Sequence, residues 1–288
     1  MKQEFLLGGD LSIKRLGFGA MRLPCNGFRT AARDPKTGLA VLRRAIELGV
    51  NHIDTAEFYQ SSDGTVQANQ LIREALYPYP SDLVIATKIG AIFEPNGEFK
   101  KASGADMRSL VEENLRSLGL ECIDLVYLRP LGMEVPHNES IAERFEALAA
   151  LQEEGLIRHL GLSNVGLRHI EEAQTIAPVA AVQNNFHIAK RDDIEVLKVC
   201  EASGIAFVPF FPLGGGMTDI SNERLAKIAE QHGASISQIA LAWLLALSPV
   251  SLAIPGTGSL SHLDENMAAA SIRLTDENLA ELAQIDQS

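Results

Sequence analysis

The strongest constraint on the fold is a regular alternation of short apolar segments with amphipathic segments. Eight strand-like segments occupy residues 16–21, 51–55, 83–88, 123–128, 159–163, 180–184, 205–210 and 251–255. Their ends recur about every 33 residues, which suits one strand and one crossover helix of a βαβ unit. The apolar runs at 82–87 and 123–128 are typical of parallel strands that are buried on both faces.

The segments between these strands have helical periodicity. Val111, Leu115 and Leu118 share one face, and Ile239 and Trp243 belong to a similar stripe near the C-terminus. Eight strand-then-helix units predict an α/β fold of the closed (β/α)8 TIM-barrel type. A doubly wound open sheet remains the structural alternative. Because no linker or low-complexity tract interrupts the pattern, we expect one domain spanning residues 1–288.

Three regions depart from the regular pattern. Residues 5–13 predict an N-terminal β-hairpin that turns at Gly8-Gly9 and caps the bottom of the barrel. Residues 89–105, with the turn pair Asn96-Gly97, and residues 129–140 are expected to be polar loops. An extra helix is expected between the seventh and eighth strands, because residues 223–231 and 235–247 are separated by Gly233.

Composition excludes several classes of protein. The chain has 25 Lys and Arg against 37 Asp and Glu, a formal charge of −12, which disfavours nucleic acid and anionic membranes as partners. Its three cysteines are scattered, so we expect no metal site, no disulfide framework and a cytoplasmic location. No signal peptide or membrane span is expected, and the composition fits a monomer or a small homo-oligomer.

Ionisable side chains stand at the predicted carboxyl ends of strands two to four, where barrel enzymes place their active groups. They are Asp54 with Tyr59 just beyond it, Lys88 and Arg129. Each alone has an ordinary structural explanation. Together they make a tuned acid, because an ammonium beside a tyrosine stabilises the phenolate and lowers its pKa, while a carboxylate keeps the lysine charged. Such an acid can protonate a carbonyl oxygen as hydride reaches the carbon.

The motifs around these residues resemble the aldo/keto reductase family. They are GVNHIDTAEFY at 49–59, ATKIG at 86–90, GLSNV at 161–165, VQ at 182–183, PFFPLG at 209–214, IPGT at 254–257 and EN at 265–266. The match runs in order through nearly the whole chain. It implies a barrel that binds NAD(P)H without a Rossmann domain. Gly17 and Gly19 do not contradict this, because Arg22 stands where a Rossmann fingerprint needs a third glycine.

The resemblance also implies the site. Tyr59 would be the proton donor, Lys88 would lower its pKa, and Asp54 would anchor the lysine. Ser163, Asn164 and Gln183 would hold the nicotinamide carboxamide, and Phe210, where the family has tyrosine, would stack on the ring. The implied cofactor-binding residues are Gly19, Met21, Ser163, Asn164, Gln183, Phe210, Pro212, Leu213, Gly214, Gly215, Pro255, Gly256, Thr257, Gly258, His262, Glu265 and Asn266.

Arg129 departs from the family pattern, which has histidine at this position. One explanation is lost catalysis, as in a cofactor-sensing or regulatory barrel. The other is that the guanidinium polarises the carbonyl or binds an anionic group of the substrate. In this arginine and in the PFFPLGG and ENMAAA segments, the chain resembles a bacterial branch of the family that is similar to pyridoxal reductase. That branch implies reduction of a small aldehyde, such as pyridoxal to pyridoxine, with reductases for other aldehydes, ketones or sugars as alternatives.

A second departure concerns the 2′-phosphate of NADPH. Where the family usually has basic residues in the last loop, this chain has Gly256 and His262. Thr257, Gly258 and Ser259 would provide hydroxyl and backbone donors at a helix N-terminus, and His262 would add charge below its pKa unless it is merely solvated. The resemblance to the related branch implies NADPH as the cofactor, with NADH as the alternative.

Overall fold

A curved sheet of seven parallel strands forms most of the barrel wall in this computed structural model, which describes residues 3–93 and 98–285. In spatial order the strands are β11 (Ala206–Phe207), β10 (Val179–Gln183), β9 (Ile157–Ser163), β8 (Ile123–Leu128), β5 (Val84–Ile89), β4 (His52–Asp54) and β3 (Phe18–Gly19). Neighbouring strands are joined through helices, so the carboxyl ends of all seven lie at the same end of the barrel.

The eighth position closes the wall without a regular strand. Ser251 pairs in parallel with Phe207, and Ala253 pairs in parallel with Leu16 beside β3. The chain at 251–253 therefore bridges the two edges of the sheet, which confirms the (β/α)8 class and excludes an open sheet. The strand expected at 251–255 lies in the predicted place but makes isolated bridges only.

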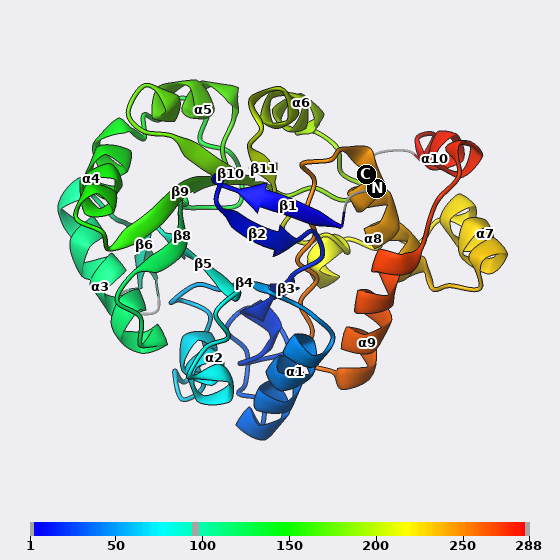
Figure 1. The fold of residues 1–288 in the computed structure, drawn as a ribbon, viewed down its shortest axis with the longest axis horizontal. Coiled ribbons are helices and arrows are strands. Elements are labelled where there is room, and N and C mark those ends of the chain that lie inside the picture. Colours follow the sequence, from blue (N-terminus) through cyan, green and yellow to red (C-terminus); the bar gives the residue numbers. More distant parts are fainter. Residues whose placement is uncertain (1–2, 94–97, 286–288) are drawn as a thin grey trace.

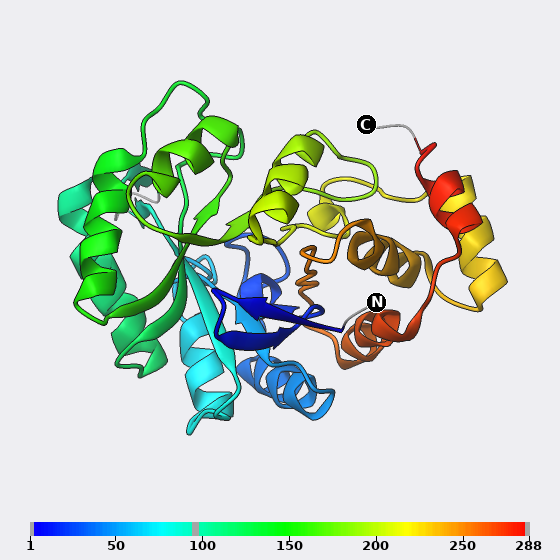
Figure 2. The same cartoon turned by 45° about the horizontal axis from the view of Figure 1, so that its top comes forward.

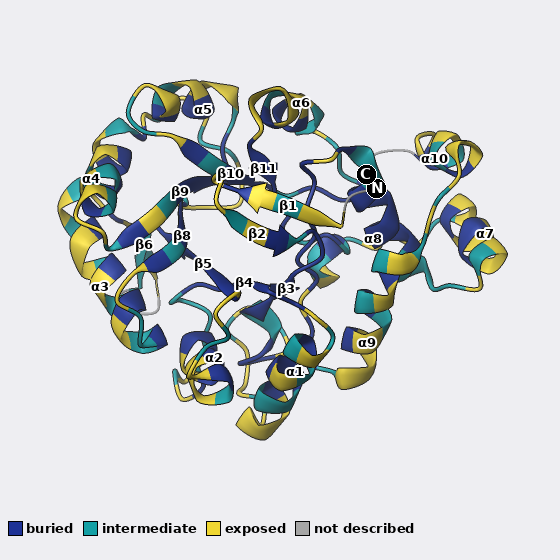
Figure 3. Ribbon diagram, viewed as in Figure 1, coloured by how far each residue is buried: buried dark blue, intermediate teal, exposed yellow. Residues whose placement is uncertain are grey.

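The helices surround the strands as an outer ring (Figure 1). They are α1 (Pro35–Glu47), α2 (Ala68–Leu76), α3 (Met107–Leu118), α4 (Ala142–Glu153), α5 (Leu167–Gln174), α6 (Ile194–Ser203), α7 (Glu223–His232), α8 (Ile236–Leu247), α9 (Leu260–Ala268) and α10 (Asp276–Leu282), with 3-10 turns at Ala20–Arg22, Gly104–Asp106, Gly214–Gly216 and Ala269–Ser271. Apart from α7 and α10, which pack against each other outside this ring with α7 beside α8, the helices turn their buried faces toward the sheet and their exposed faces outward (Figure 3). The extra helix expected between strands seven and eight is α7, which packs beside α10.

An N-terminal hairpin covers the amino-terminal end of the barrel, as predicted (Figure 2). Its strands β1 (Glu4–Leu7) and β2 (Leu11–Lys14) are antiparallel, and Gly8 and Gly9 make the turn at φ values of +61° and +89°, which favour glycine. Leu7 and Ile13 are almost fully buried and pack against Val84 and other interior residues of the strands. The hairpin thereby seals the apolar floor beneath the site.

The expectation of a plain loop at 89–105 is wrong in part. Within it, β6 (Ala91–Phe93) and β7 (Phe99–Lys101) pair antiparallel and are followed by the turn at Gly104–Asp106. Cross-strand contact of Phe93 with Phe99, at 5.3 Å between ring centroids, stabilises this small hairpin. The Asn96-Gly97 pair lies outside the described residues. Residues 129–140 contain no helix or strand, as expected.

Among the described residues, no helix has both the length and the apolar composition needed to cross a bilayer.

Candidate active site

Three neighbouring strands bring the predicted acid–base residues together. Asp54 ends β4, Lys88 is the penultimate residue of β5, and Arg129 follows β8 directly. These strands are adjacent in the order β4–β5–β8, so their side chains reach one rim of the barrel. Tyr59 reaches the same rim from the loop after β4. The structure therefore gathers all four predicted groups.

A buried ion pair forms the base of the site. The Nζ of Lys88 lies 2.5 Å from Oδ1 of Asp54, and both side chains are only 3% exposed. The same ammonium donates to the carbonyl of Thr55 at 3.0 Å, and Nε2 of Gln183 donates to Oδ2 of Asp54 at 2.7 Å. Burial alone would lower the pKa of Lys88, but Asp54 and Tyr59 outweigh burial and raise that pKa. Lys88 is therefore held as a cation.

The aromatic ring of Tyr59 lies next to this cation, with the ammonium of Lys88 over its face. The Nζ of Lys88 lies 4.9 Å from the centroid of the Tyr59 ring. Burial raises the pKa of Tyr59 above its ordinary value, while Lys88 and, more weakly, Arg129 act in the opposite direction. The expected net lowering of this pKa is therefore wrong for the chain by itself, because desolvation of the phenolate outweighs its cationic neighbours. Tyr59 is a protonated phenol at neutral pH, as a proton donor must be.

Arg129 adds a second cation to the site. Its Nη1 donates to Oγ of Ser163 at 3.0 Å, and its Nη2 donates to the carbonyl of Gly132 at 3.2 Å. The guanidinium carbon lies 5.0 Å from the centroid of the Phe210 ring. Burial lowers the pKa of Arg129, but Tyr59 and Asp54 oppose the change. An arginine starts so far above neutrality that the group stays charged.

The three residues predicted to hold a carboxamide already have protein partners. Ser163 accepts from Arg129, and Gln183 donates to Asp54. Asn164, in the left-handed region at φ +58°, donates from Nδ2 to the carbonyls of Gly132 and Glu134. In contrast, Oε1 of Gln183 is buried without a hydrogen-bond partner among the described residues. That oxygen is an available acceptor at the rim.

A narrow cleft of about 150 Å³ leads away from Asp54 and Tyr59. Of the predicted residues, Gly19, Met21, Phe210, Pro212, Leu213, Gly215, Pro255 and Gly256 line it; Arg22, Phe211, Gly216 and Ile254 also do so and were not predicted. Gly214 is buried and is not part of the lining. An added Cβ on Gly256 would meet the carbonyl oxygen of Gly19 at 2.5 Å, so this close approach requires glycine.

The last loop uses part of its hydrogen-bonding capacity internally. Oγ1 of Thr257 accepts from the amide of Ser259, and Oγ of Ser259 caps α9 by accepting from the amide of His262. His262 itself is exposed. Glu265 accepts from the hydroxyl of Ser235, which ties α9 to the start of α8. Asn266 is buried, and Gly258 lies against the guanidinium of Arg33.

A second cavity, of about 490 Å³, meets the cleft at Tyr59 and Phe210. Aromatic and aliphatic side chains dominate its lining, with Lys88, Arg129 and Gln183 at its inner end. Phe58 lies 5.2 Å from Tyr59 and 5.9 Å from Phe99 between ring centroids. The wall-forming aromatics Phe28, Phe58 and Phe99 were not predicted. Only the position of Phe58, directly before Tyr59, signalled such a role.

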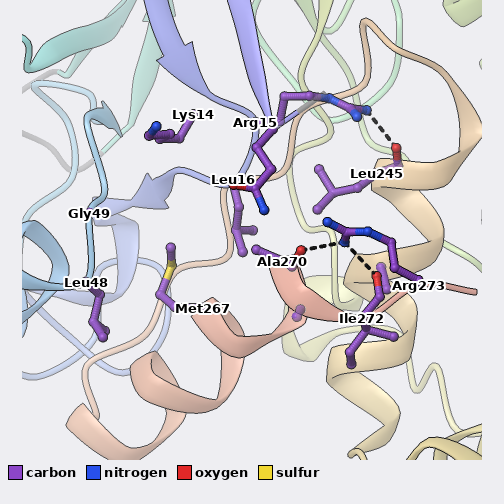
Figure 4. A pocket seen from close by; sticks show the side chains of 13 residues that line it. Lys14, Arg15, Leu16, Leu48, Gly49, Leu245, Met267, Ala270, Ile272 and Arg273 are labelled. Atoms are coloured by element: carbon purple, nitrogen blue, oxygen red, sulfur yellow. Dashed lines mark hydrogen bonds between the residues drawn. The ribbon is translucent and has the colours of Figure 1, made fainter. Parts of the chain in front are cut away.

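A third cavity, of about 190 Å³, lies at the opposite end of the barrel (Figure 4). Arg15 and Arg273 border it, and both guanidiniums donate to backbone carbonyls. Arg15 reaches the carbonyls of Leu245 and Ser251, and Arg273 reaches those of Ala270 and Ile272. These cations stabilise the ends of helical segments, and none of the predicted site residues lies here.

Comparisons with known proteins agree with this geometry. The model of the aldo/keto reductase family matches residues 15–287. Pyridoxine 4-dehydrogenase of Escherichia coli K12 is 45% identical over 282 residues, covering 97% of both chains, and a probable aldo-keto reductase of Glycine max is 31% identical over 94% of this chain and 84% of its own.

Solved structures give the same result. A thermostable aldo-keto reductase in complex with epalrestat superimposes with a TM-score of 0.83 at 30% identity, covering 99% of this chain and all of the other. An aldo/keto reductase from Klebsiella pneumoniae in complex with NADP and acetate gives 0.83 at 25% identity, covering 99% and 95%. The chain belongs to the aldo/keto reductase family and is an NAD(P)H-dependent oxidoreductase.

Proposed function

We propose that this protein is an NADPH-dependent reductase of small aromatic aldehydes, and that pyridoxal, reduced to pyridoxine, is its substrate. The observation that carries the proposal is the buried Asp54–Lys88 pair beneath Tyr59, placed where a narrow cleft meets an aromatic cavity. The Escherichia coli relative named for pyridoxine supports the choice of substrate. The Klebsiella structure with NADP supports the choice of cofactor.

The cleft has the features that a nicotinamide dinucleotide needs. The free Oε1 of Gln183 can accept from the carboxamide, whose oxygen can accept from the hydroxyl of Ser163. Phe210 offers a ring face for stacking. Gly19 and Gly256 leave backbone exposed where a side chain would block approach. Bound there, NADPH would supply hydride to the substrate carbon.

The residues of the chain would supply the proton and the orientation. Tyr59 would donate its phenolic proton to the carbonyl oxygen, and the adjacent Lys88 cation would stabilise the phenolate that remains. Asp54 keeps Lys88 charged and fixes its position. Gln183 in turn fixes the other oxygen of Asp54.

Arg129 and the aromatic walls would select the substrate. Phe28, Phe58 and Phe99 offer faces and edges to a planar ring. At the inner end, Arg129 presents a permanent positive charge close to Tyr59, where an ionised ring oxygen of pyridoxal would lie beside the aldehyde. The same charge would help polarise the carbonyl.

A panel assay tests the proposal. NADPH oxidation is measured with pyridoxal, with neutral aromatic aldehydes, and with aliphatic and sugar aldehydes. We expect the highest kcat/KM for pyridoxal and weak turnover of sugars, which have no aromatic face. Tight NADPH binding without turnover of any aldehyde would instead favour a cofactor-sensing barrel, and a preference for sugars would exclude the proposed substrate class.

Arg129→Met sharpens the substrate assignment. Loss of the guanidinium should reduce kcat/KM about tenfold or more for pyridoxal and much less for benzaldehyde, because only pyridoxal has an ionised oxygen to lose a partner. Equal losses for both aldehydes would show that Arg129 acts on the carbonyl and not on the ring oxygen.

A further inference from the structure

We propose that Arg33, at the end of the loop that enters α1, binds the 2′-phosphate of NADPH and replaces the basic residues that the last loop lacks. This inference rests on the proposed use of NADPH. It concerns a residue outside the sequence motifs, in a segment that the family resemblance did not place near the cofactor. Its basis is a contact between two segments that are more than two hundred residues apart in sequence.

The guanidinium of Arg33 fills the space that a side chain at position 258 would occupy. A Cβ added to Gly258 would lie 2.6 Å from the guanidinium carbon of Arg33, and Nη1 of Arg33 points to the Gly258 carbonyl at 3.4 Å. The glycine does not serve a left-handed turn, since its φ lies outside that region. Its structural effect is to make room for a cation supplied by another segment.

Arg33 has donor capacity that the protein does not use. Its Nε is buried and has no hydrogen-bond partner among the described residues. Its Nη2 donates to Oδ1 of Asn26, which is uncharged. No ion pair of Arg33 occurs in the described part of the chain. In a protein with a net charge of −12, an arginine held beside a loop without an acidic partner is suited to an anionic ligand.

The backbone holds this arginine in place. The amide of Arg33 donates to the carbonyl of Pro24 at 2.8 Å, and Cys25 pairs with Ala32 in an antiparallel bridge. Beyond it, α1 and α9 lie side by side (Figure 1), joined by an ion pair of Arg44 with Asp264 at 2.9 Å. The position of Arg33 beside the last loop is therefore set by the fold before any ligand arrives.

The lining of the cleft ends at Gly256, two residues before Gly258. From Tyr59 it runs between two glycine-containing segments, 212–216 and 254–256. Arg22 contacts the first of them, since its Nη2 donates to the carbonyl of Gly215, and Arg33 contacts the continuation of the second at Gly258. A dinucleotide with its nicotinamide at Tyr59 that followed these two segments would bring its distal end toward Arg33 and the hydroxyls of the last loop.

The experiment is a binding measurement on the full chain without substrate. Calorimetry gives the Kd of NADPH, NADH, 2′,5′-ADP and 5′-AMP for the wild type and for Arg33→Met. We expect the variant to bind NADPH and 2′,5′-ADP about 10- to 100-fold more weakly, the effect of losing charged hydrogen bonds. NADH and 5′-AMP, which have no 2′-phosphate, should change less than about twofold.

Two further variants separate phosphate binding from structural support. Arg273→Met removes the same charge at the opposite end of the barrel and should leave all four Kd values unchanged. Arg33→Met combined with Gly258→Lys places an ammonium in the vacated space, and should recover much of the NADPH affinity without altering NADH. Unfolding midpoints identify any variant whose fold is damaged.

The outcomes distinguish the inference from the proposed function. If the wild type binds neither dinucleotide, the proposed function fails. If the wild type prefers NADPH but Arg33→Met keeps that preference, Arg33 is not the phosphate ligand. Equal weakening of NADPH and NADH, with no recovery in the lysine variant, would likewise overturn the assignment and leave Arg33 as a support of the loop.

Discussion

Each end of the barrel buries a cation, and the two are held in different ways. At the carboxyl end of the strands Lys88, 3% exposed, pairs with the carboxylate of Asp54. At the amino end Arg15, 4% exposed, donates to the backbone carbonyls of Ser251, Leu245 and Ser248 at 2.5 to 3.0 Å. One cation pairs with a titratable carboxylate, and the other donates to backbone carbonyls, which cannot take up a proton.

This difference indicates that the two cations have different roles, one in catalysis and one in stabilising the fold. The pair at the carboxyl end faces a phenol and opens into two cavities, so its charge can act on a ligand. The arginine at the amino end joins the end of α8 to the segment that closes the barrel, so its charge acts on the fold. We therefore expect the first cation to control turnover and the second to control stability.

The largest effect should come from the phenol above Lys88. Tyr59→Phe removes the proposed proton donor and should reduce kcat for aldehyde reduction about 10³-fold, within the range that general acid catalysis supplies. The ring and its packing remain, so the Kd of NADPH should change less than about twofold. Steady-state kinetics and calorimetry give the two quantities.

Tyr77→Phe is the matched control, because it removes the same hydroxyl from an exposed ring outside the site. Its kcat should equal that of the wild type. Retained turnover in Tyr59→Phe would show that another group protonates the substrate, and the contrast between the two ends would lose its chemical basis.

The next effect tests the other end. Arg15→Met leaves the buried carbonyls of Leu245, Ser248 and Ser251 without this donor, and should lower the free energy of unfolding by about 3 kcal/mol. Because Arg15 lies far from Tyr59 along the barrel axis, kcat of the folded fraction should be unchanged. Urea unfolding and kinetics at a temperature well below the midpoint measure both.

Arg273→Met is the control for this change. Arg273 borders the same cavity, is exposed, and among the described residues donates only to carbonyls within its own turn, so its loss should cost less than about 0.5 kcal/mol. A selective fall of kcat in Arg15→Met, with stability preserved, would contradict the division between the two ends.

The regular parts of the molecule could be predicted from the sequence because they depend on local pattern. Continuous apolar runs marked the long strands β5 and β8, and the pair Gly8-Gly9 marked the N-terminal turn. Asp54, Lys88 and Arg129 could be found because strand ends meet at one rim of a barrel. Each of these expectations needed only residues near in sequence and a rule for how strands align.

Features that depend on distant contacts could not be predicted. The eighth strand reduces to bridges at Ser251 and Ala253, since its neighbours determine how it pairs. The raised pKa of Tyr59 depends on burial by several segments, which outweighs the visible lysine. Arg33 meets Gly258 only because an irregular segment turns back toward the last loop, and periodicity gives no information on such a path.

The smallest of the predicted effects on activity and stability concerns His52, in the barrel interior between the two ends. His52 precedes Asp54 by two residues on β4, is 1% exposed, and neither ring nitrogen has a hydrogen-bond partner among the described residues. Burial lowers the pKa of His52 from 6.5 to about 4; Asp54 opposes this change and Lys88 adds to it. The interior thus keeps a neutral ring between the two buried cations, and protonation of that ring would add an uncompensated charge.

The sign of the pH dependence follows from this pKa. His52 takes up a proton at a higher pH in the unfolded chain than in the folded chain. The contribution of neutral His52 to stability is therefore fully present above pH 6.5 and is lost as the pH falls toward 4. At pH 5 the loss should be about 2 kcal/mol relative to pH 8. His52→Leu removes this contribution. Urea unfolding at the two pH values should therefore show that the free energy of unfolding falls by about 2 kcal/mol less in the variant than in the wild type. If both proteins lose stability equally between pH 8 and pH 5, then His52 accepts a proton in the folded protein as readily as in the unfolded chain. The interior between the two buried cations would then not require a neutral ring.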